Sequence, residues 1–334
     1  LSLYISNFGA FSRIRMPAFA ALLCISSFGF QQNGKIHRFC RKIPIFLKDN
    51  IAYLLQWARN LRPSYKAYLG AYFIILILAI FFDKLLALGI LVITLLSLLA
   101  LLMAHKIGIR DKKFYILFLI AILVHLSAAV FIYYTNFYPF GGGAGDGSKY
   151  HQVALELSAR FREGDFSIKG FDKFYPDLYV SHYYPVVLAV LYVLTAPSII
   201  VGVSLNVWFA ALSIVFLYLI VKEIGGTDNN AFLAGLIASI YPSYLYFGSL
   251  LIKDAILVCF TLLALLFLIK LIKNFSWERF LILSLAIGVV LHFRFYIGVT
   301  LLLTLVASSL FMDLDNKEKI NPVRKNFFSN GVKL

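Results

Sequence analysis

Residues 85–104 read LLALGILVITLLSLLALLMA and residues 114–135 read FYILFLIAILVHLSAAVFIYYT, and neither stretch holds an Asp, Glu, Lys or Arg. A helix needs about 20 apolar residues to cross the hydrocarbon core of a bilayer, which is roughly 30 Å thick. Both stretches reach that length. Because only helices and closed barrels satisfy every backbone polar group within lipid, these runs predict an all-α membrane protein.

The composition of the whole chain supports the same class. Of the 334 residues, 61% are hydrophobic and 14% are charged, whereas soluble domains carry about 25% charged residues. The net charge of +15 would suggest nucleic-acid binding in a soluble protein. In a membrane protein an excess of Lys and Arg is typical of cytoplasmic loops, so we expect no nucleic-acid partner. Cys24, Cys40 and Cys259 lie far apart and show no disulfide or metal-site spacing.

Further apolar runs raise the predicted number of transmembrane helices to about eight. Three of them pass the same length test, at residues 198–221, 231–251 and 255–273. The run Tyr68–Phe82 is shorter, but only Asp83 and Lys84 separate it from the next run, so we interpret the two runs as a hairpin. The run 280–312 is too long for one comfortable span, and we interpret it as two short helices with Arg294 at the turn.

The 13-residue run Tyr184–Ala196 decides the topology. Its length is typical of an interfacial or re-entrant segment. If it does not cross the membrane, 23 of the 31 Lys and Arg lie on the cytoplasmic side, and if it does cross, they divide into 16 and 15. The positive-inside rule favours the first arrangement. We therefore expect both termini in the cytoplasm and a large first outer loop, residues 136–197, that carries interfacial amphipathic helices.

These runs divide the chain into four parts. They are a basic cytoplasmic or interfacial segment (1–66), a transmembrane hairpin (67–113), a transmembrane core with its outer loop (114–312) and a cytoplasmic tail (313–334). Within the first part, the apolar run 17–30 has two interpretations. It is either a signal or extra span, or an amphipathic segment that lies on anionic membrane lipids.

The outer loop contains a carboxylate next to a predicted helix. Residues 137–166 read FYPFGGGAGDGSKYHQVALELSARFREGDF, and the glycines do not form a phosphate-binding P-loop because Ser148 and Lys149 follow Gly147 in the wrong order. The apolar residues that follow recur along one face of a helix: Tyr150, Val153, Ala154, Leu157 and Phe161. We expect this amphipathic helix on the membrane surface, with Asp146 at the mouth of the bundle. The alternative for Asp146 is ordinary Asp-Gly turn chemistry.

The predicted topology brings more polar residues to the same outer side. Lys253 and Asp254 lie in the turn between two spans, His292 and Arg294 in another, and His182 precedes the interfacial run. An ionisable group at membrane depth costs about 2.5–3.5 kcal/mol and often marks a site. A solvated hairpin turn is the alternative for Lys253 and Asp254. Arg294 interrupts an apolar run and therefore predicts an anionic partner, such as a phosphate.

Carboxylates beside Arg and Lys at membrane level suit one class of reaction. The substrate would be a lipid phosphate whose headgroup is transferred to a hydroxyl. A carboxylate would accept the proton of the hydroxyl, and the cations would stabilise the departing phosphate.

Several segments in this order resemble a known family. These segments are YHQVALEL, HYYPVVLAVLYVL, PSIIVGVSLNVWFAALSIVFLYLIVKEIGG, AFLAGLIASIYPSYLYFGSLLIKDAILVCFTLLALLFLIK and LAIGVVLHFRFYIGVTLLL. Together they resemble the C-type membrane glycosyltransferases, particularly the protein O-mannosyltransferase and aminoarabinose transferase group, over roughly residues 114–312.

The resemblance implies an inverting transferase of a prokaryotic plasma (inner) membrane, with its active site on the non-cytoplasmic face. It implies a polyprenyl-phosphate-linked sugar as donor and a protein, lipid or glycan hydroxyl as acceptor. Asp146 matches the catalytic Asp of the first outer loop and Asp254 the acidic position of the second, while Arg294, helped by Lys253, would bind the donor phosphate. One departure is Gly147, which stands where the family usually has a second acidic residue.

Other interpretations stay open beside this one. Asp254, His182 and His292 would orient the acceptor or associate with a divalent metal ion, which is the candidate cofactor. A transporter or flippase of a lipid-linked or anionic substrate would use the same polar residues along a path. A non-catalytic, truncated relative is the third interpretation, because the chain ends soon after the eighth predicted span.

Overall fold

The computed structural model describes residues 74–138, 146–166 and 183–314. The chain divides into two units, Leu1–Ile74 and Ile75–Leu334, and the described residues belong almost entirely to the second. Several predictions fall outside the described residues: those on 1–66 with the run 17–30, on the start of the hairpin at 67–73, on the glycines before Asp146, on His182, and on the tail beyond residue 314.

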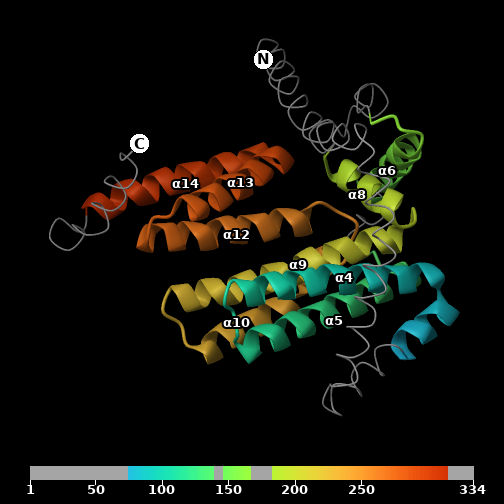
Figure 1. Ribbon diagram of the computed structural model, residues 1–334, viewed down its shortest axis with the longest axis horizontal. Coiled ribbons are helices and arrows are strands. Elements are labelled where there is room, and N and C mark those ends of the chain that lie inside the picture. The colour runs from blue at the N-terminus through green and yellow to red at the C-terminus, as the bar shows by residue number, and fades with distance from the viewer. Residues whose placement is uncertain (1–73, 139–145, 167–182, 315–334) are drawn as a thin grey trace, which may run out of the picture. The chain divides into compact units, whose positions relative to one another are not determined.

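All regular structure in the described ranges is helical (Figure 1). Four helices are long and apolar enough to cross a membrane: α4 (Lys84–Lys106), α5 (Lys112–Thr135), α9 (Ile199–Glu223) and α12 (Asp254–Lys273). Their mean hydropathy lies between 2.3 and 2.9. The predicted all-α membrane class is therefore confirmed. The described residues hold four such helices, or five if a bent pair counts as one span, so the predicted number of eight is not confirmed.

Helices α4 and α5 run antiparallel and each packs on α9, and polar residues join the two at one end. Asp83 caps α4 by accepting a hydrogen bond from the Leu85 amide at 2.7 Å. Its other carboxylate oxygen accepts one from the Tyr134 hydroxyl, near the end of α5, at 2.5 Å. The Tyr134 bond is the main reason why the pKa of Asp83 lies below its usual value. Asp83 thus joins the first residues of α4 to the last turn of α5.

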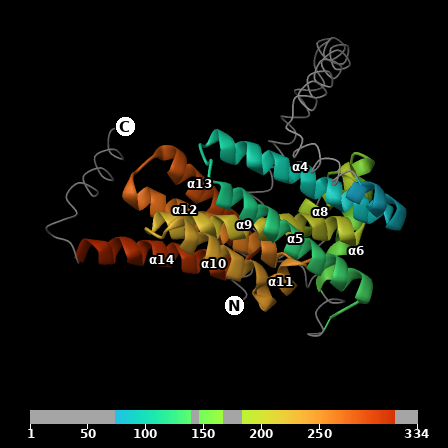
Figure 2. The ribbon, with the colours of Figure 1, turned by 90° about the horizontal axis from the view of Figure 1, so that it is seen from below.

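Helix α9 is the central helix of this unit. In its most apolar 18-residue window 72% of the residues are buried, against 28–39% for the other three long helices. It packs against α4, α5, α12 and α10 (Asp228–Ile240), which surround it in Figures 1 and 2. Small side chains allow a close approach, since a Cβ on Gly89 of α4 would lie 2.3 Å from Ser204 Oγ of α9. The predicted span 198–221 therefore forms the core.

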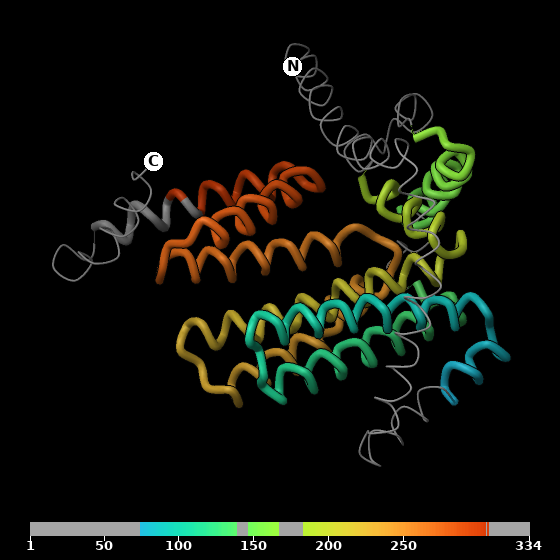
Figure 3. The backbone as a smooth tube through the Cα atoms, in the orientation of Figure 1, coloured from blue at the N-terminus to red at the C-terminus, as the bar shows by residue number. Residues whose placement is uncertain are grey.

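Three consecutive helices pack beside α9 as a layer. Helix α12 contacts α9 and α13 (Trp277–Phe293), and α13 in turn contacts α14 (Phe295–Leu314). The backbone of these three helices can be traced in Figure 3. Arg294 has extended backbone and separates α13 from α14. The prediction of two helices with Arg294 at the turn is confirmed.

The predicted span 231–251 is not one continuous helix. It is broken into α10 and α11 (Pro242–Gly248), which meet at an angle of 65°. The ring of Pro242 disfavours helical geometry at the preceding residue, and Tyr241 is accordingly extended, with φ −62° and ψ 119°. A proline at the first position of a new helix lacks only a hydrogen bond that this position does not need. Hydropathy does not register such a break, because both halves are apolar.

The amphipathic helix predicted after the glycines forms as α6 (Asp146–Arg162), and all five predicted apolar residues are buried. Its apolar face packs against α8 (Tyr183–Leu194), so the expectation that this face rests on the membrane needs correction. The rings of Tyr150 and Tyr184 meet edge to face with centroids 5.1 Å apart, and His151 Nδ1 lies 2.9 Å from the Tyr192 hydroxyl. The 12 residues of α8 are too few to cross a membrane.

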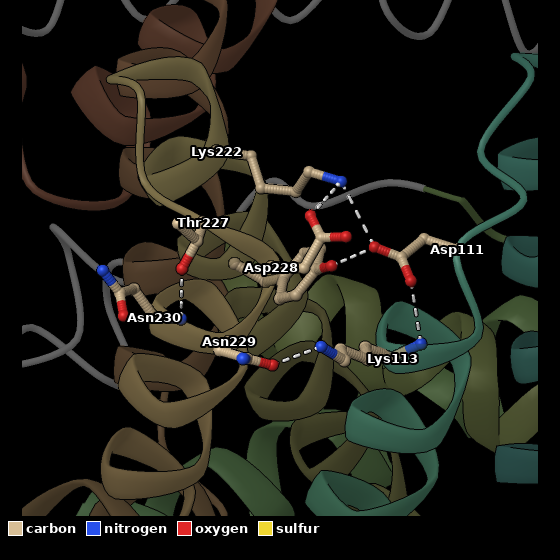
Figure 4. Close-up of polar contacts among 8 residues, drawn as sticks. Asp111, Lys113, Lys222, Thr227, Asp228, Asn229 and Asn230 are labelled. Atoms are coloured by element: carbon tan, nitrogen blue, oxygen red, sulfur yellow. Dashed lines mark hydrogen bonds and ion pairs between the residues drawn. The ribbon is translucent and has the colours of Figure 1, made fainter.

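Ion pairs connect the helices at the opposite end of the bundle (Figure 4). Lys222 Nζ lies 2.8 Å from Asp228 Oδ1 and 3.2 Å from Asp111 Oδ2, and Asp111 also accepts a hydrogen bond from the Tyr218 hydroxyl. Lys113 Nζ donates to the Asn229 side chain. These contacts join α5, α9 and α10. Similar pairs from Glu223 to Lys270 and Lys273 join α9 to α12.

We expect Asp111→Ala to lower the free energy of unfolding by about 1–3 kcal/mol. The change removes the N-cap of α5, in which Asp111 accepts from the Lys113 amide at 3.0 Å, and it leaves the Tyr218 hydroxyl without its acceptor. Denaturant titration in detergent micelles would measure the loss. Asp228→Ala is the control: its side chain is 52% exposed and should cost less than about 1 kcal/mol.

The effect of Asp111→Ala should also depend on pH. Partial burial raises the pKa of Asp111, but hydrogen bonds from Tyr218, the Lys113 amide and Lys222 outweigh it and hold the pKa below its usual value. The stabilisation is therefore present above the unfolded pKa of about 4 and is lost as the pH falls through the lower folded value. Equal losses for Asp111→Ala and Asp228→Ala at neutral pH would contradict this account.

Candidate functional site

Two buried side chains attach the connection between α11 and α12, residues 249–253, to neighbouring helices: Ser249 Oγ donates to the His125 backbone oxygen of α5 at 3.1 Å, and the Asn206 amide binds the rest. Asn206 of α9 is fully buried, and its Nδ2 donates to the backbone oxygens of Leu250 at 2.5 Å and Ile252 at 2.6 Å. Its Oδ1 accepts a hydrogen bond from the Tyr184 hydroxyl of α8 at 3.0 Å. Asn206 therefore fixes the α11–α12 connection and attaches it to α8.

An ion pair lies directly after the connection. Asp254 is the first residue of α12, and its Oδ1 lies 2.9 Å from Nη2 of Arg294. Arg294 Nη1 donates to the Tyr296 hydroxyl at 3.1 Å. Each side chain of the pair is about one third exposed, at 32% for Arg294 and 35% for Asp254, so solvent reaches it. The sequence predicts an anionic partner for Arg294, and in the structure Asp254 is one such partner.

Lys253 carries a second positive charge at this end of the bundle. Partial burial and the nearby Arg294 guanidinium lower the pKa of Lys253 below its usual value, while the carboxylates of Asp254 and Asp146 act in the opposite direction. One further cation, Arg294, and two carboxylates thus lie within electrostatic reach of Lys253.

Asp146 reaches this group because α6 begins against the connection. It is the first residue of α6 and is exposed. The next residue, Gly147, is buried, and a Cβ at this position would lie 3.2 Å from the backbone oxygen of Leu251. Any larger residue would press against that backbone. The glycine at this position therefore permits the close approach of α6 to the connection.

A small cavity lies beside this contact. Its volume is about 60 Å³, and it is lined by Gly147, Ser148, residues 249–252 and residues of α5 and α9 such as Ala129, Tyr133 and Val203. Pockets that enclose a small-molecule ligand usually measure about 300–1,000 Å³. The cavity is too small to hold a sugar, so the exposed side of the charged group is the better candidate for substrate binding.

His292 lies near the same group but makes a different contact. It belongs to the last turn of α13, and its ring centroid lies 3.3 Å from that of Tyr183, the first residue of α8. This contact brings the end of α13 to the start of α8. His182 precedes Tyr183 in the sequence, but it lies outside the described residues.

The described residues do not offer a set of ligands for a divalent metal ion. Within these ranges no three His, Cys, Asp or Glu side chains gather closely enough to hold one. The carboxylate with the most suitable position, Asp254, faces Arg294. The metal association predicted for Asp254, His182 and His292 stays a prediction, because His182 lies outside the described residues.

Sequence reasoning missed Asn206, although it left a signal. Asn206 has the only amide side chain in the apolar run 198–221, and a polar group within a span needs a partner. Its partners, Leu250 and Ile252, are 44 and 46 residues away along the chain. The Tyr184 hydroxyl was missed for the same reason, since its role depends on Asn206.

Comparison with known proteins finds one family. Residues 183–321 match the family model described as dolichyl-phosphate-mannose-protein mannosyltransferase. No curated protein and no solved structure gives a significant match to the chain. The family match confirms the resemblance to the C-type glycosyltransferases and indicates a membrane glycosyltransferase of the mannosyltransferase type. The matched range contains Asn206, Lys253, Asp254 and Arg294, whereas Asp146 precedes it.

We expect Gly147→Val to displace the start of α6 from the connection, because its Cβ would meet the Leu251 backbone oxygen rather than a movable side chain. The loss of unfolding free energy should be about 1–3 kcal/mol, as for other overpacked sites. Thermal unfolding in detergent would measure it. Gly288→Val is the matched control, because nothing lies within 4 Å of a Cβ on this helical glycine. Equal stability of the two variants would contradict the close contact.

Proposed function

We propose that the protein transfers a sugar from a polyprenyl-phosphate donor to an acceptor hydroxyl, with inversion, on the non-cytoplasmic face of the membrane. The acceptor would belong to a protein, a lipid or a glycan. The observation that carries the proposal is the Asp254–Arg294 ion pair inside the family match, with Lys253 and Asp146 beside it.

The proposed reaction assigns one role to each charged residue. Asp146 accepts the proton of the acceptor hydroxyl, and the acceptor oxygen attacks the anomeric carbon on the face opposite the phosphate. The bond between the anomeric carbon and the phosphate oxygen breaks, and the phosphate leaves with the electron pair. Arg294 and Lys253 stabilise the negative charge of the leaving phosphate. The configuration at the anomeric carbon is inverted because attack and departure occur on opposite faces.

Asp254 suits a supporting role in this scheme. An Arg guanidinium has five N–H donors in a planar fork, and contacts to Asp254 and Tyr296 engage both of its terminal nitrogens without using all five. The hydrogen bond to Tyr296 and the attraction of the Asp254 carboxylate together restrain the position of the fork. A phosphate that binds there would meet an oriented cation, which requires less ordering of the side chain on binding.

The proposed orientation is that of eight helices with both termini in the cytoplasm and the outer loop 136–197 on the other side. It is supported by the separation of the charged residues in the described part of the chain. Asp146, Lys253, Asp254 and Arg294 lie at one end of the helices, whereas the basic stretches 106–113 and 270–279 lie at the other. The positive-inside rule assigns the second end to the cytoplasm. We infer a plasma (inner) membrane of a prokaryotic cell.

A transporter or flippase is the second candidate function, and the bend between α10 and α11 favours it. Broken helices often mark the substrate site of a transporter near the middle of the bilayer. Here the break lies between a 13-residue and a 7-residue helix, and the shorter one leads directly to the connection. The break thus serves to place the connection at one end of the bundle, which agrees better with surface chemistry than with a central path.

We expect Asp146→Asn to lower the rate of sugar transfer by about 10²–10⁴-fold, because the amide cannot accept the proton. Transfer from a radiolabelled polyprenyl-phosphate sugar in membranes would measure the effect. Asp165→Asn is the control: this exposed residue pairs with Arg160 at the far end of α6 and should leave the rate unchanged. Near wild-type transfer by a folded Asp146→Asn protein would remove the base assignment. Movement of intact donor across the membrane without cleavage would favour the transporter.

We expect Lys253 to set an alkaline limit to activity. The cation is lost as the pH rises, and since the pKa of Lys253 lies below its usual value, kcat/KM should fall at a pH below the ordinary lysine pKa of about 10.4. Lys253→Arg keeps its charge over this range and should move the fall to higher pH. The measurement is a pH profile of transfer, with Lys84→Arg as control at the start of α4. If kcat/KM of Lys253→Arg falls at the same pH as that of the wild type, Lys253 is not the group that causes the fall.

A further inference from the structure

We propose that Asn206 is a positioning residue that holds Lys253 and Asp254 in register with Arg294 through the backbone of the α11–α12 connection. The inference rests on the proposed function for its effect on sugar transfer. That Asn206 fixes the connection by hydrogen bonds does not depend on the proposed function.

The connection needs partners that it does not supply itself. It leaves helical geometry after α11, and three of its residues, Ser249, Leu250 and Leu251, are buried. Carbonyl groups at the end of a helix have no partner within that helix. One internal bond exists, from the Ile252 amide to the Leu250 oxygen at 3.0 Å. A buried polar group without a partner costs about 1–3 kcal/mol, so the connection depends on donors from elsewhere.

Asn206 supplies these donors from the centre of the core. Both of its N–H groups are used, one by each carbonyl, and its oxygen accepts from Tyr184. An Asn side chain has two donors and two acceptor positions, so three of four are engaged. The two carbonyls flank Leu251, against which Gly147 packs. A shift at these two points would therefore move the start of α6 as well as the start of α12.

The position of Ile252 explains the link to the charged residues. Ile252 directly precedes Lys253, and Asp254 opens α12 and contacts Arg294. The Asn206 bond to the Ile252 oxygen thus acts one peptide unit away from Lys253 and two away from Asp254. Misplacement of a catalytic group by about 1 Å can lower a rate about 10²-fold. Asn206 lies too deep to touch the substrate, since it is fully buried, so its effect would pass through the backbone.

Tyr184 extends the hold to α8. The tyrosine is fully buried, and its hydroxyl reaches Asn206 while its ring meets Tyr150 of α6. The neighbouring Tyr183 contacts His292 of α13. Asn206 therefore joins the elements that carry all four charged residues of the site.

The test compares Asn206→Leu with a matched control. Leu has the same number of side-chain heavy atoms as Asn, carries no charge and removes all three hydrogen bonds. Ser204→Ala is the control, because Ser204 is buried in the same helix and donates only to the oxygen of Ile200 at 2.9 Å, within that helix. Tyr184→Phe removes one bond and keeps the ring. It serves as the second variant if Asn206→Leu does not fold.

We expect Asn206→Leu to lower kcat about 10²-fold and to raise the KM for a polyprenyl-phosphate sugar, while the KM for the acceptor stays constant. The alkaline limb of the pH profile should also move, because the neighbours of Lys253 change. Tyr184→Phe should show smaller effects in the same direction, and Ser204→Ala should stay within about twofold. A folded Asn206→Leu protein with wild-type kcat and pH profile would overturn the positioning role.

Hydrogen–deuterium exchange gives a readout that does not depend on transfer. Amides of residues 249–254 and of the start of α8 should exchange faster in Asn206→Leu than in the wild type, and unchanged in Ser204→Ala. If the amides exchange faster in Asn206→Leu but the wild type transfers no sugar, the proposed function is refuted. The conclusion that Asn206 holds the connection would still stand. Unchanged exchange in Asn206→Leu would refute the hold itself.

Discussion

A chain that leaves helical geometry inside an apolar bundle must find hydrogen-bond partners in the protein, because lipid offers none. The α11–α12 connection meets this constraint through Asn206, whose two N–H groups bind the Leu250 and Ile252 oxygens. The rest of the candidate site follows from this arrangement. The connection fixes where α12 begins, hence where Asp254 lies, and it offers the backbone against which Gly147 places α6.

The charged side chains are arranged differently at the two ends of the described bundle. At one end, Lys222 lies between Asp111 and Asp228, and Glu223 lies between Lys270 and Lys273, so positive and negative groups alternate and join the helices. At the other end, Lys253 and Arg294 lie close enough for Arg294 to lower the pKa of Lys253. Two neighbouring cations repel each other and gain from any anion that binds between them. The first end is therefore suited to stability, and the second, where Asp254 and Asp146 accompany the two cations, is the end at which we propose that a phosphate binds.

The sequence predicts much of this architecture where the signal is local. The uncharged runs predict α4, α5, α9 and α12, and the apolar period of 3.6 residues predicts the buried face of α6 from Tyr150 to Phe161. Arg294 marks the turn between α13 and α14 because a charge within a long apolar run has few other positions. The break at Tyr241 is not evident from hydropathy, since it depends on the ring of Pro242. The partner of Arg294 is not evident either, because Asp254 lies forty residues earlier and meets it only through the packing of α12 on α13.

Asp146, the proposed base, lies outside the family match but is joined to the matched part by packing. The match begins at residue 183, and it contains the cations and the connection but not α6. Two contacts join α6 to the matched part: Gly147 against Leu251, and Tyr150 against Tyr184. Both lead back to Asn206, since it binds the residues on either side of Leu251 and the hydroxyl of Tyr184. A base and its cations fixed to one buried amide would keep their spacing even while the exposed side chains move, and such constant spacing is what an in-line transfer between two bound substrates requires.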